Sequence, residues 1–296
     1  MSKFFAHIIY LITLPLALLP FKLLYYISDL SFFSVYHIIR YRRKLVRKNL
    51  RNSFPDKTEE EIVSIEKDFY HHLCDYYFET IKLLNISDFR MKKHFVFKNE
   101  ELIQYFLNDG KSVILMLGHY GNWEWVASIT LWVKDENTAI GQIYRPLRNK
   151  AFDLFFLKLR ARFHSIGFAK NEIYREIIKM RRAGKKWLLG FISDQRPSPH
   201  NIHYWTQFLN QDTPVLNGAE KIAKQTGAVV CYLDVKKIKR GFYEGKVKLI
   251  AENSKETEEF EITEKYMRLM EKTILRNPAY YLWSHKRWKH KREDFQ

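Results

Sequence analysis

Residues 112–117 (SVILML), followed directly by residues 118–124 (GHYGNWE), decide the fold. The first run is short, uninterrupted and apolar, which is typical of a strand buried on both faces of a parallel sheet. The chain then breaks at a polar turn with two glycines, and a helical pattern resumes from Trp123 to Val133. A buried strand that leads through a turn into a helix predicts the start of a βαβ unit.

The same alternation of strand and helix patterns continues along the chain. Further strands are expected near residues 138–144, 187–193, 228–235 and 244–250. Helices are expected near residues 58–84, 99–109, 149–165, 171–183, 215–226 and 257–276. Strands separated by helices of this length predict an α/β fold, with a mostly parallel central sheet flanked by helices.

Composition narrows the classes of partner. The 296 residues include 50 Lys+Arg and 33 Asp+Glu, which gives a formal charge of +17. Cys74 and Cys231 are the only cysteines, each in an apolar setting, and this excludes a disulfide scaffold and a zinc site built on paired cysteines. We expect no metal and no cofactor. A basic globular protein of this kind fits an anionic partner, such as nucleic acid, a phospholipid surface or an acidic carrier protein.

The N-terminus favours a membrane. Residues 4–21 (FFAHIIYLITLPLALLPF) contain only three polar side chains, His7, Tyr10 and Thr13. Their length is at the short end of what spans a bilayer, and two prolines interrupt them. No small-residue cleavage site follows, which argues against a cleavable signal peptide. A buried core helix is the alternative; we expect an uncleaved N-terminal anchor helix that spans the membrane or lies in its interface.

A basic segment follows the apolar one. Residues 40–51 (RYRRKLVRKNLR) carry seven basic side chains and no acid. This is the positive-inside pattern, and each well-placed charge binds anionic headgroups with about 1 kcal/mol. A solvated helix face is the alternative, although acids usually interleave there. No zinc-finger or RNP-like motif accompanies the charge, so we expect no nucleic acid as partner. The predicted division is a membrane-anchor and juxtamembrane segment, residues 1–51, and a catalytic domain, residues 52–296, on the cytoplasmic side.

A second basic cluster lies near the C-terminus. Residues 282–293 (LWSHKRWKHKRE) place five Lys and Arg side chains around Trp283 and Trp288. Tryptophan with basic residues suits a membrane interface or an acidic carrier protein. An RNA-binding tail is the alternative, but attachment to the same membrane explains both basic clusters at once.

Three polar groups of residues follow predicted strands. They are residues 118–124, the tripeptide Tyr144-Arg145-Pro146 and the tripeptide Asp194-Gln195-Arg196. In open α/β sheets, ligands bind outside the carboxyl ends of the strands, so we expect these groups to meet there.

His119 and Glu124 are the candidate acid–base residues of the first group. On a continuous helix they would point about 140° apart, so they can meet only if the chain turns between them. Gly121 permits such a turn, and Asn122 is a good N-cap for the following helix. Glu124 could then accept the Nδ1 proton of His119 and leave Nε2 as a base. The alternative is a core histidine beside an unrelated glutamate.

Other catalytic motifs are missing from the sequence. It has no Gly-rich phosphate loop and no GxSxG elbow, and both cysteines lie in apolar runs. A histidine that acts directly on a substrate hydroxyl therefore fits better than a covalent nucleophile.

These motifs together resemble the late acyltransferases of lipid A biosynthesis, within the wider superfamily of glycerolipid acyltransferases. GHYGNWE supplies the family's histidine, four residues and an acid. The further matching blocks are YRPLRN (144–149) with Arg160 and Arg162, SDQRPSP (193–199) with the segment 208–230, and NPAYYLWSHKRWKHKRE (277–293). The resemblance covers nearly the whole chain.

The resemblance implies transfer of a fatty acyl group from a thioester to a hydroxyl of a membrane glycolipid, such as a lipid A precursor, at the bacterial inner membrane. The donor would be acyl carrier protein or coenzyme A. His119 would deprotonate the acceptor hydroxyl, and Glu124 would orient the imidazole of His119. Arg145 and Asp194 would border the active site. Arg145 suits a phosphorylated acceptor, or simply forms a surface ion pair.

Asn122, Gln195 and Arg196 complete the candidate substrate-binding residues. Capping alone explains Asn122, and the other two could simply belong to an ordered loop. Two other functions remain open: a non-catalytic lipid-binding protein of the membrane surface, and an acyltransferase for another lipid, such as an amino-acid-linked lipid.

Overall fold

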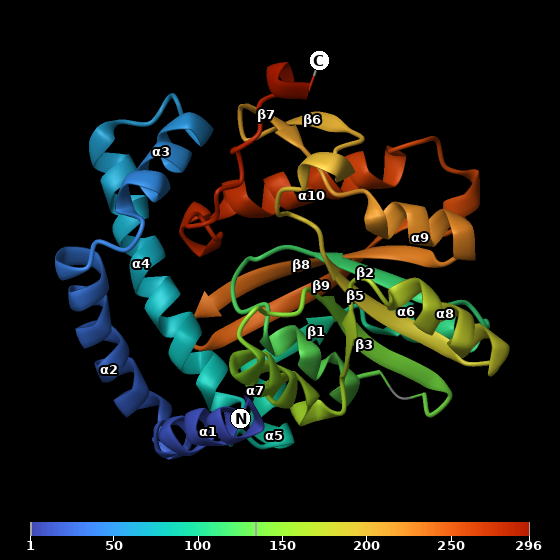
Figure 1. Cartoon of the computed structure of the whole chain (residues 1–296), viewed down its shortest axis with the longest axis horizontal. Helices are drawn as coiled ribbons and strands as arrows, with labels where there is room; N and C mark the ends of the chain where they lie inside the picture. The colour runs from blue at the N-terminus through green and yellow to red at the C-terminus, as the bar shows by residue number, and fades with distance from the viewer. Residues whose placement is uncertain (1, 134, 296) are drawn as a thin grey trace.

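A seven-stranded sheet forms the centre of the computed structural model, which describes residues 2–133 and 135–295 (Figure 1). In spatial order its strands are β1 (Phe95–Lys98), β9 (Phe242–Ala251), β8 (Val229–Lys239), β2 (Val113–Leu117), β5 (Lys186–Ile192), β3 (Thr138–Tyr144) and β4 (Ile166–Ala169). Neighbouring strands are parallel except β8 and β9, which form an antiparallel hairpin. The predicted fold class is confirmed.

Helices cover the sheet, and a small hairpin lies apart from it. The helices are α1 (Ser2–Leu18), α2 (Phe21–Phe33), α3 (Arg43–Ser53), α4 (Glu59–Lys82), α5 (Asp88–His94), α6 (Glu101–Asn108), α7 (Lys150–Arg160), α8 (Ile173–Arg182), α9 (Gly218–Thr226) and α10 (Glu261–Arg276). The hairpin consists of β6 (Trp205–Phe208) and β7 (Gln211–Pro214). In Figure 1, α4 runs beside the sheet, with α2 on its outer side.

The central strand β2 and the start of α4 form as their sequence patterns predict. All five residues of β2 are buried, as expected of a central parallel strand. The predicted capping box begins α4: Thr58 accepts from the amide of Glu61, and the carboxylate of Glu61 accepts from the amide of Thr58.

Some elements differ from the expectation. The short strands β1 and β4 and the β6–β7 hairpin were missed, because runs of four residues carry too little periodicity. The helix expected from Trp123 to Val133 is a 3-10 helix, Trp125–Leu131.

The N-terminal apolar segment forms two helices instead of one. α1 ends at Leu18 and α2 begins at Phe21, and the axes bend by 115° between them. Pro20 explains the break, because it lacks an amide hydrogen and disfavours helical geometry in the residue before it. Within residues 2–133 and 135–295, no single helix is long and apolar enough to cross a membrane; α1 and the segment Phe21–Ile38 satisfy that test only together.

Both N-terminal helices pack on the rest of the protein. α1 contacts α7 and α4, and α2 contacts α4. At the bend, Lys82 of α4 donates hydrogen bonds to the main-chain oxygens of Ala17, at 2.7 Å, and Leu19, at 2.6 Å. These oxygens belong to the end of α1, where helical partners are lacking. Burial lowers the pKa of Lys82.

Acids of α4 pair with much of the basic segment 40–51. Arg43 and Arg47 both bind the buried carboxylate of Glu66, and Arg47 and Arg51 bind Glu59. Residues 40–51 themselves contain no acid, but in the folded protein the acids of α4 lie among these basic side chains. Fewer of their charges therefore remain for an external partner.

The C-terminal tryptophans also differ from the expectation. Trp283 is fully buried, and Trp288 packs against the core while its Nε1 donates to Thr213 at 2.7 Å. Their predicted place in a membrane interface was therefore wrong. Lys286, Lys289 and Lys291 of this segment are exposed.

The contact of Lys82 generates a first test. Lys82→Met should lower the free energy of unfolding by about 2 kcal/mol, because two carbonyl oxygens at the bend lose their donor. Thermal unfolding of the purified full chain measures the change. Lys67→Met, on the exposed side of the same helix, is the matched control and should leave the midpoint unchanged. Equal midpoints for the two variants would contradict the capping role of Lys82.

Candidate active site

The loop that follows β2 carries the first group of polar residues and is held by several elements. Gly121 has φ +61°, a left-handed conformation that favours glycine. Its amide donates to the oxygen of Tyr280 at 3.0 Å, and an added Cβ would lie only 3.0 Å from Val235 Cγ1. The predicted turn is therefore present, and its backbone is tied to the C-terminal segment.

Strand register brings His119 and Asp194 together. Leu117 of β2 pairs with Ile192 of the parallel neighbour β5, so the residues two positions further on lie side by side. His119 Nδ1 and Asp194 Oδ1 are 2.7 Å apart. Asp194 is almost fully buried, whereas the side chain of His119 is 17% exposed and can meet a substrate.

The hydrogen bond to Asp194 fixes how the imidazole is used. A carboxylate accepts, so Nδ1 carries the proton and Nε2 keeps a free electron pair. Burial by itself raises the pKa of Asp194, but the charge and hydrogen bonds of His119 outweigh it and hold that pKa below its ordinary value. Asp194 therefore remains ionised at neutral pH, and His119 has the tautomer that a base acting through Nε2 requires.

Glu124 is not the partner of His119, so that expectation was wrong. Its carboxylate is buried and forms a bidentate pair with Arg160 of α7, with distances of 2.8 Å and 2.6 Å. Asp194 reaches Nδ1 from the adjacent strand, while a buried Glu124 needs a cation of its own. Arg160 belongs to the second matching block of sequence, where it has no assigned role. From α7, its guanidinium supplies that cation.

The remaining candidates have different surroundings. Gln195 Nε2 lies 3.2 Å from His119 Nε2 and donates to it, given the tautomer above. Arg196 contacts His290 Nε2 at 3.0 Å. Arg145 is exposed in the loop after β3, and no ion pair or hydrogen bond of its side chain occurs within the described parts of the chain.

Asn122 is buried and engaged at both ends of its amide. Its oxygen accepts from the amide of Trp125 at 3.2 Å, at the first residue of the 3-10 helix, whose N-cap position is Glu124 and not Asn122 as predicted. Its nitrogen donates to Glu79 Oε2 at 2.8 Å. These contacts give Asn122 a place inside the protein rather than on a substrate-facing surface.

Sequence reasoning missed several polar residues around this loop. His72 and Glu79 of α4 reach the loop directly, but α4 carries many other polar residues, so the sequence held no distinct signal for these two. Arg287 is fully buried, and its Nε and one terminal nitrogen have no hydrogen-bond partner among the described residues. Burial lowers the pKa of nearby His285 to about 4, so this imidazole is neutral. No cluster of three or more His, Cys, Asp or Glu residues with metal-binding geometry occurs in the ranges described.

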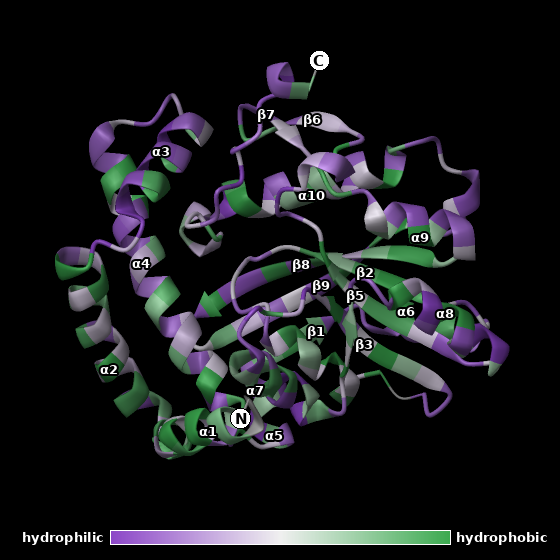
Figure 2. Ribbon diagram, viewed as in Figure 1, coloured by the Kyte–Doolittle hydropathy of each residue, from purple (hydrophilic) through white to green (hydrophobic). Residues whose placement is uncertain are grey.

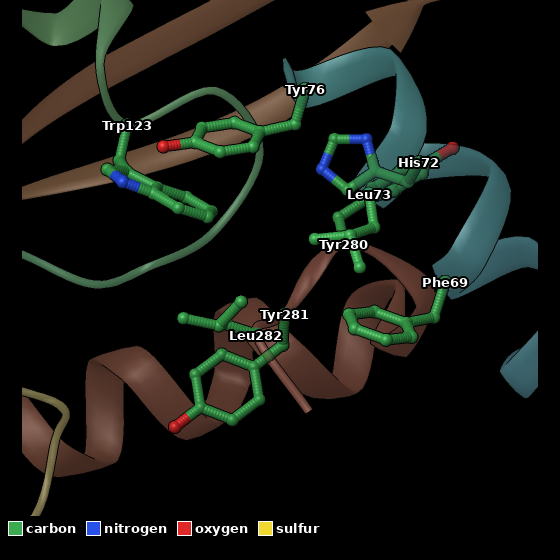
Figure 3. Close-up of a pocket in the computed structure, with 8 residues that line it drawn as sticks. All are labelled: Phe69, His72, Leu73, Tyr76, Trp123, Tyr280, Tyr281 and Leu282. Atoms are coloured by element: carbon green, nitrogen blue, oxygen red, sulfur yellow. The ribbon is translucent and has the colours of Figure 1, made fainter. Parts of the chain in front are cut away.

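A small apolar pocket lies beside the loop that follows β2 (Figure 3). Its lining comes from α4, the loop after β2 and the C-terminal segment: Phe69, His72, Leu73, Tyr76, Trp123, Tyr280, Tyr281 and Leu282. The rings of Tyr76 and Trp123 stack with centroids 4.0 Å apart, and the Trp123 ring is 5.2 Å from that of His119. One aromatic ring therefore separates the pocket from the candidate base.

Comparison with known families places these features in context. The family of bacterial lipid A biosynthesis acyltransferases matches residues 1–290. The chain belongs to this family. It is therefore an acyltransferase of the lipid A biosynthesis type. Among curated proteins, no sequence matches the chain.

The pair between Glu124 and Arg160 generates a second test. Arg160→Met should reduce the free energy of unfolding by about 3 kcal/mol, because it leaves a buried carboxylate without its cation. Adding Glu124→Leu should restore most of this loss, since both charges are then gone. Thermal unfolding of the single and double variants gives the coupling.

Arg148→Met, an exposed arginine just before the same helix, is the control and should change stability little. Additive losses in the Arg160 and Glu124 double variant would contradict a direct pair.

Proposed function

We propose that this acyltransferase moves a fatty acyl chain from a thioester to a hydroxyl of a membrane glycolipid, with His119 as general base. The observation that carries the proposal is the 2.7 Å hydrogen bond between His119 Nδ1 and buried Asp194. It leaves Nε2 able to accept a proton and places a negative charge where an imidazolium would form.

The reaction balances with these groups alone. Nε2 takes the proton of the acceptor hydroxyl while its oxygen attacks the thioester carbonyl carbon. The tetrahedral intermediate collapses, the C–S bond breaks, and the imidazolium returns the proton to the leaving sulfur. Gln195, now hydrogen-bonded to Nε2, gives up this position when the acceptor hydroxyl binds.

Neighbouring surfaces support the assignment of substrates. Exposed Lys286, Lys289 and Lys291 suit an acidic acyl carrier protein, with coenzyme A as the other donor. Arg145, free of internal partners among the described residues, suits a phosphate of a lipid A precursor.

The N-terminal helices support attachment to the cytoplasmic side of the bacterial inner membrane. Figure 2 shows α1 and α2 as the most continuously apolar helices at the edge of the molecule. Their outward side chains include Phe5, Ile12, Leu30 and Phe33, all more than half exposed. We retain residues 1–51 as the attachment segment and residues 52–296 as the acyltransferase domain.

The catalytic proposal is tested by the tautomer of His119. Asp194→Asn should lower kcat by about 10³-fold or more, because an amide can donate to Nδ1 and move the proton to Nε2. His119→Ala should be at least as severe. The assay is transfer of a labelled acyl group from acyl carrier protein to a lipid A precursor in mixed micelles, with membrane binding as the control for folding.

Full activity of His119→Ala would overturn the proposal. An inactive wild-type chain that still binds the lipid would favour the non-catalytic function. Activity on an amino-acid-linked lipid but not on the lipid A precursor would change the acceptor.

Membrane attachment has a separate test. The double variant Leu30→Lys and Phe33→Lys should weaken binding to anionic phospholipid vesicles about tenfold or more, because two apolar side chains no longer leave water. Vesicle flotation measures the bound fraction. Ile178→Lys replaces a half-exposed apolar residue on α8 and should bind like wild type. Equal binding of both would contradict attachment through α2.

A further inference from the structure

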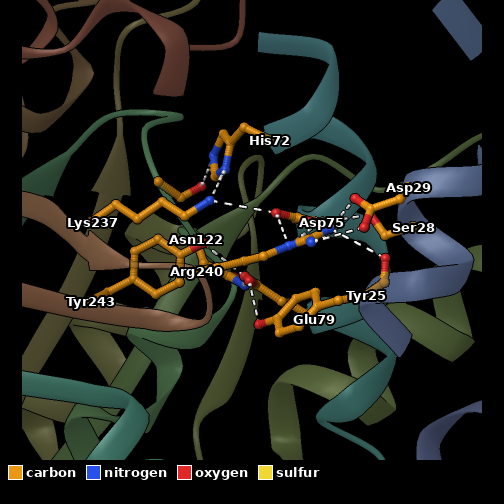
Figure 4. A network of polar contacts seen from close by, with 11 residues as sticks. Tyr25, Ser28, Asp29, His72, Asp75, Glu79, Asn122, Lys237, Arg240 and Tyr243 are labelled. Atoms are coloured by element: carbon orange, nitrogen blue, oxygen red, sulfur yellow. Dashed lines mark hydrogen bonds and ion pairs between the residues drawn. The ribbon is translucent and has the colours of Figure 1, made fainter. Parts of the chain in front are cut away.

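A network of polar side chains, buried except at its α2 end, connects α2 with the loop that carries His119 (Figure 4). It passes from α2 through α4 and the β8–β9 hairpin to Gly121 and Asn122. Its members are Tyr25, Ser28, Asp29, His72, Asp75, Glu79, Asn122, Lys237, Arg240 and Tyr243. The mechanism proposed above uses none of the side chains that α2 and α4 contribute.

Glu79 holds the loop on both sides of Glu124. Its Oε2 accepts from Asn122 Nδ2 and from the Tyr243 hydroxyl, each at 2.8 Å. Its main-chain oxygen accepts from the indole of Trp125 at 2.9 Å. Its Oε1 accepts from the hydroxyl of Tyr25 of α2 at 3.1 Å, so one residue connects the loop to the N-terminal helix.

His72 holds the turn itself. Its Nε2 donates to the oxygen of Gly121 at 3.2 Å, and its Nδ1 lies 3.3 Å from Lys237 Nζ. This arrangement needs a neutral ring with the proton on Nε2. Burial supplies it, because it lowers the pKa of His72 well below the ordinary value.

The other end of the network fastens α2. Ser28 donates to Asp75 Oδ1 at 2.7 Å, and Arg240 donates to both Asp75 and Asp29. Lys237 Nζ, 3.6 Å from Asp75, links this cluster to His72. The contacts are therefore continuous from α2 to the residue two positions after His119.

Packing α2 against α4 does not by itself require such a polar network. Burying charged groups costs free energy that their pairing only partly offsets, and apolar side chains could pack α2 on α4 equally well. A network of hydrogen bonds also fixes geometry, because each donor and acceptor restricts the position of its partner. The partners here are the backbone and side chains of the catalytic loop, where a displacement of about 1 Å costs roughly 100-fold in rate.

We propose that Glu79 and His72 are positioning residues for His119, and that α2 completes the network that holds them in place. This inference rests on the proposed function, since it assigns a rate effect to residues that do not touch the substrate. An N-terminal helix thereby contributes to the turnover number and not only to attachment.

Substitutions at Glu79 separate positioning from packing. Glu79→Leu removes the acceptor of Asn122 and should lower kcat about 100-fold, with the KM for the acyl donor changed by less than about twofold. Glu79→Gln keeps an oxygen for Asn122 and Tyr243, and should retain kcat within about fivefold. Adding Tyr243→Phe to Glu79→Leu should reduce kcat no further, because the Tyr243 hydroxyl acts through its hydrogen bond to Glu79.

The contribution of α2 has a matched pair of variants that removes only one hydroxyl each. Tyr25→Phe loses the hydrogen bond to Glu79 and should lower kcat about fivefold with the KM unchanged. Tyr26→Phe, on the exposed side of the same helix, should behave as wild type. Vesicle flotation should show equal membrane binding for both.

The outcomes are distinguishable from failure of the catalytic proposal. If wild type is active, His119→Ala is inactive and Glu79→Leu keeps full kcat, the positioning role is wrong while the base assignment stands. If Glu79→Leu does not fold, the comparison of kcat between Tyr25→Phe and Tyr26→Phe tests the positioning role instead. Equal kcat for those two, or a change in KM alone, would overturn the role of α2.

Discussion

The hydrogen bond between His119 Nδ1 and Asp194 is the interaction on which the candidate site depends. It arises from the sheet, because the register of β2 and β5 places both residues at the same distance beyond paired strand ends. Rigid neighbouring strands hold this geometry more closely than a flexible loop would. The exposed edge of the imidazole, with Nε2 unprotonated, then follows from the tautomer that the buried carboxylate selects.

The motif His-x4-Glu therefore consists of two residues with different partners. His119 is oriented by Asp194, whereas Glu124 ties the following turn to α7 through Arg160. Between them, Gly121 and Asn122 are held by α4. Three parts of the chain, the end of β5, α7 and α4, thus hold one short loop that carries the candidate base.

The sequence was sufficient for the fold class and for the meeting of two of the three predicted polar groups. Apolar runs predicted five of the seven strands of the central sheet, β3 with its observed limits. The polar residues after β2 and β5 do meet at the carboxyl edge of the sheet. It could not identify which acid binds His119, because that depends on the order of strands, which a single sequence does not reveal. Contacts between segments far apart in the sequence were likewise not predictable. Glu66 of α4 neutralises part of the basic segment, and the indole of Trp283 belongs to the core.

The tautomer of His119 tests the central claim most directly. In protein labelled with ¹⁵N-histidine, the His119 signals can be assigned by their loss in His119→Ala. At mildly alkaline pH the proton should reside on Nδ1, with Nε2 unprotonated, and Asp194→Asn should move it to Nε2. A proton on His119 Nε2 in the wild-type protein would contradict the account.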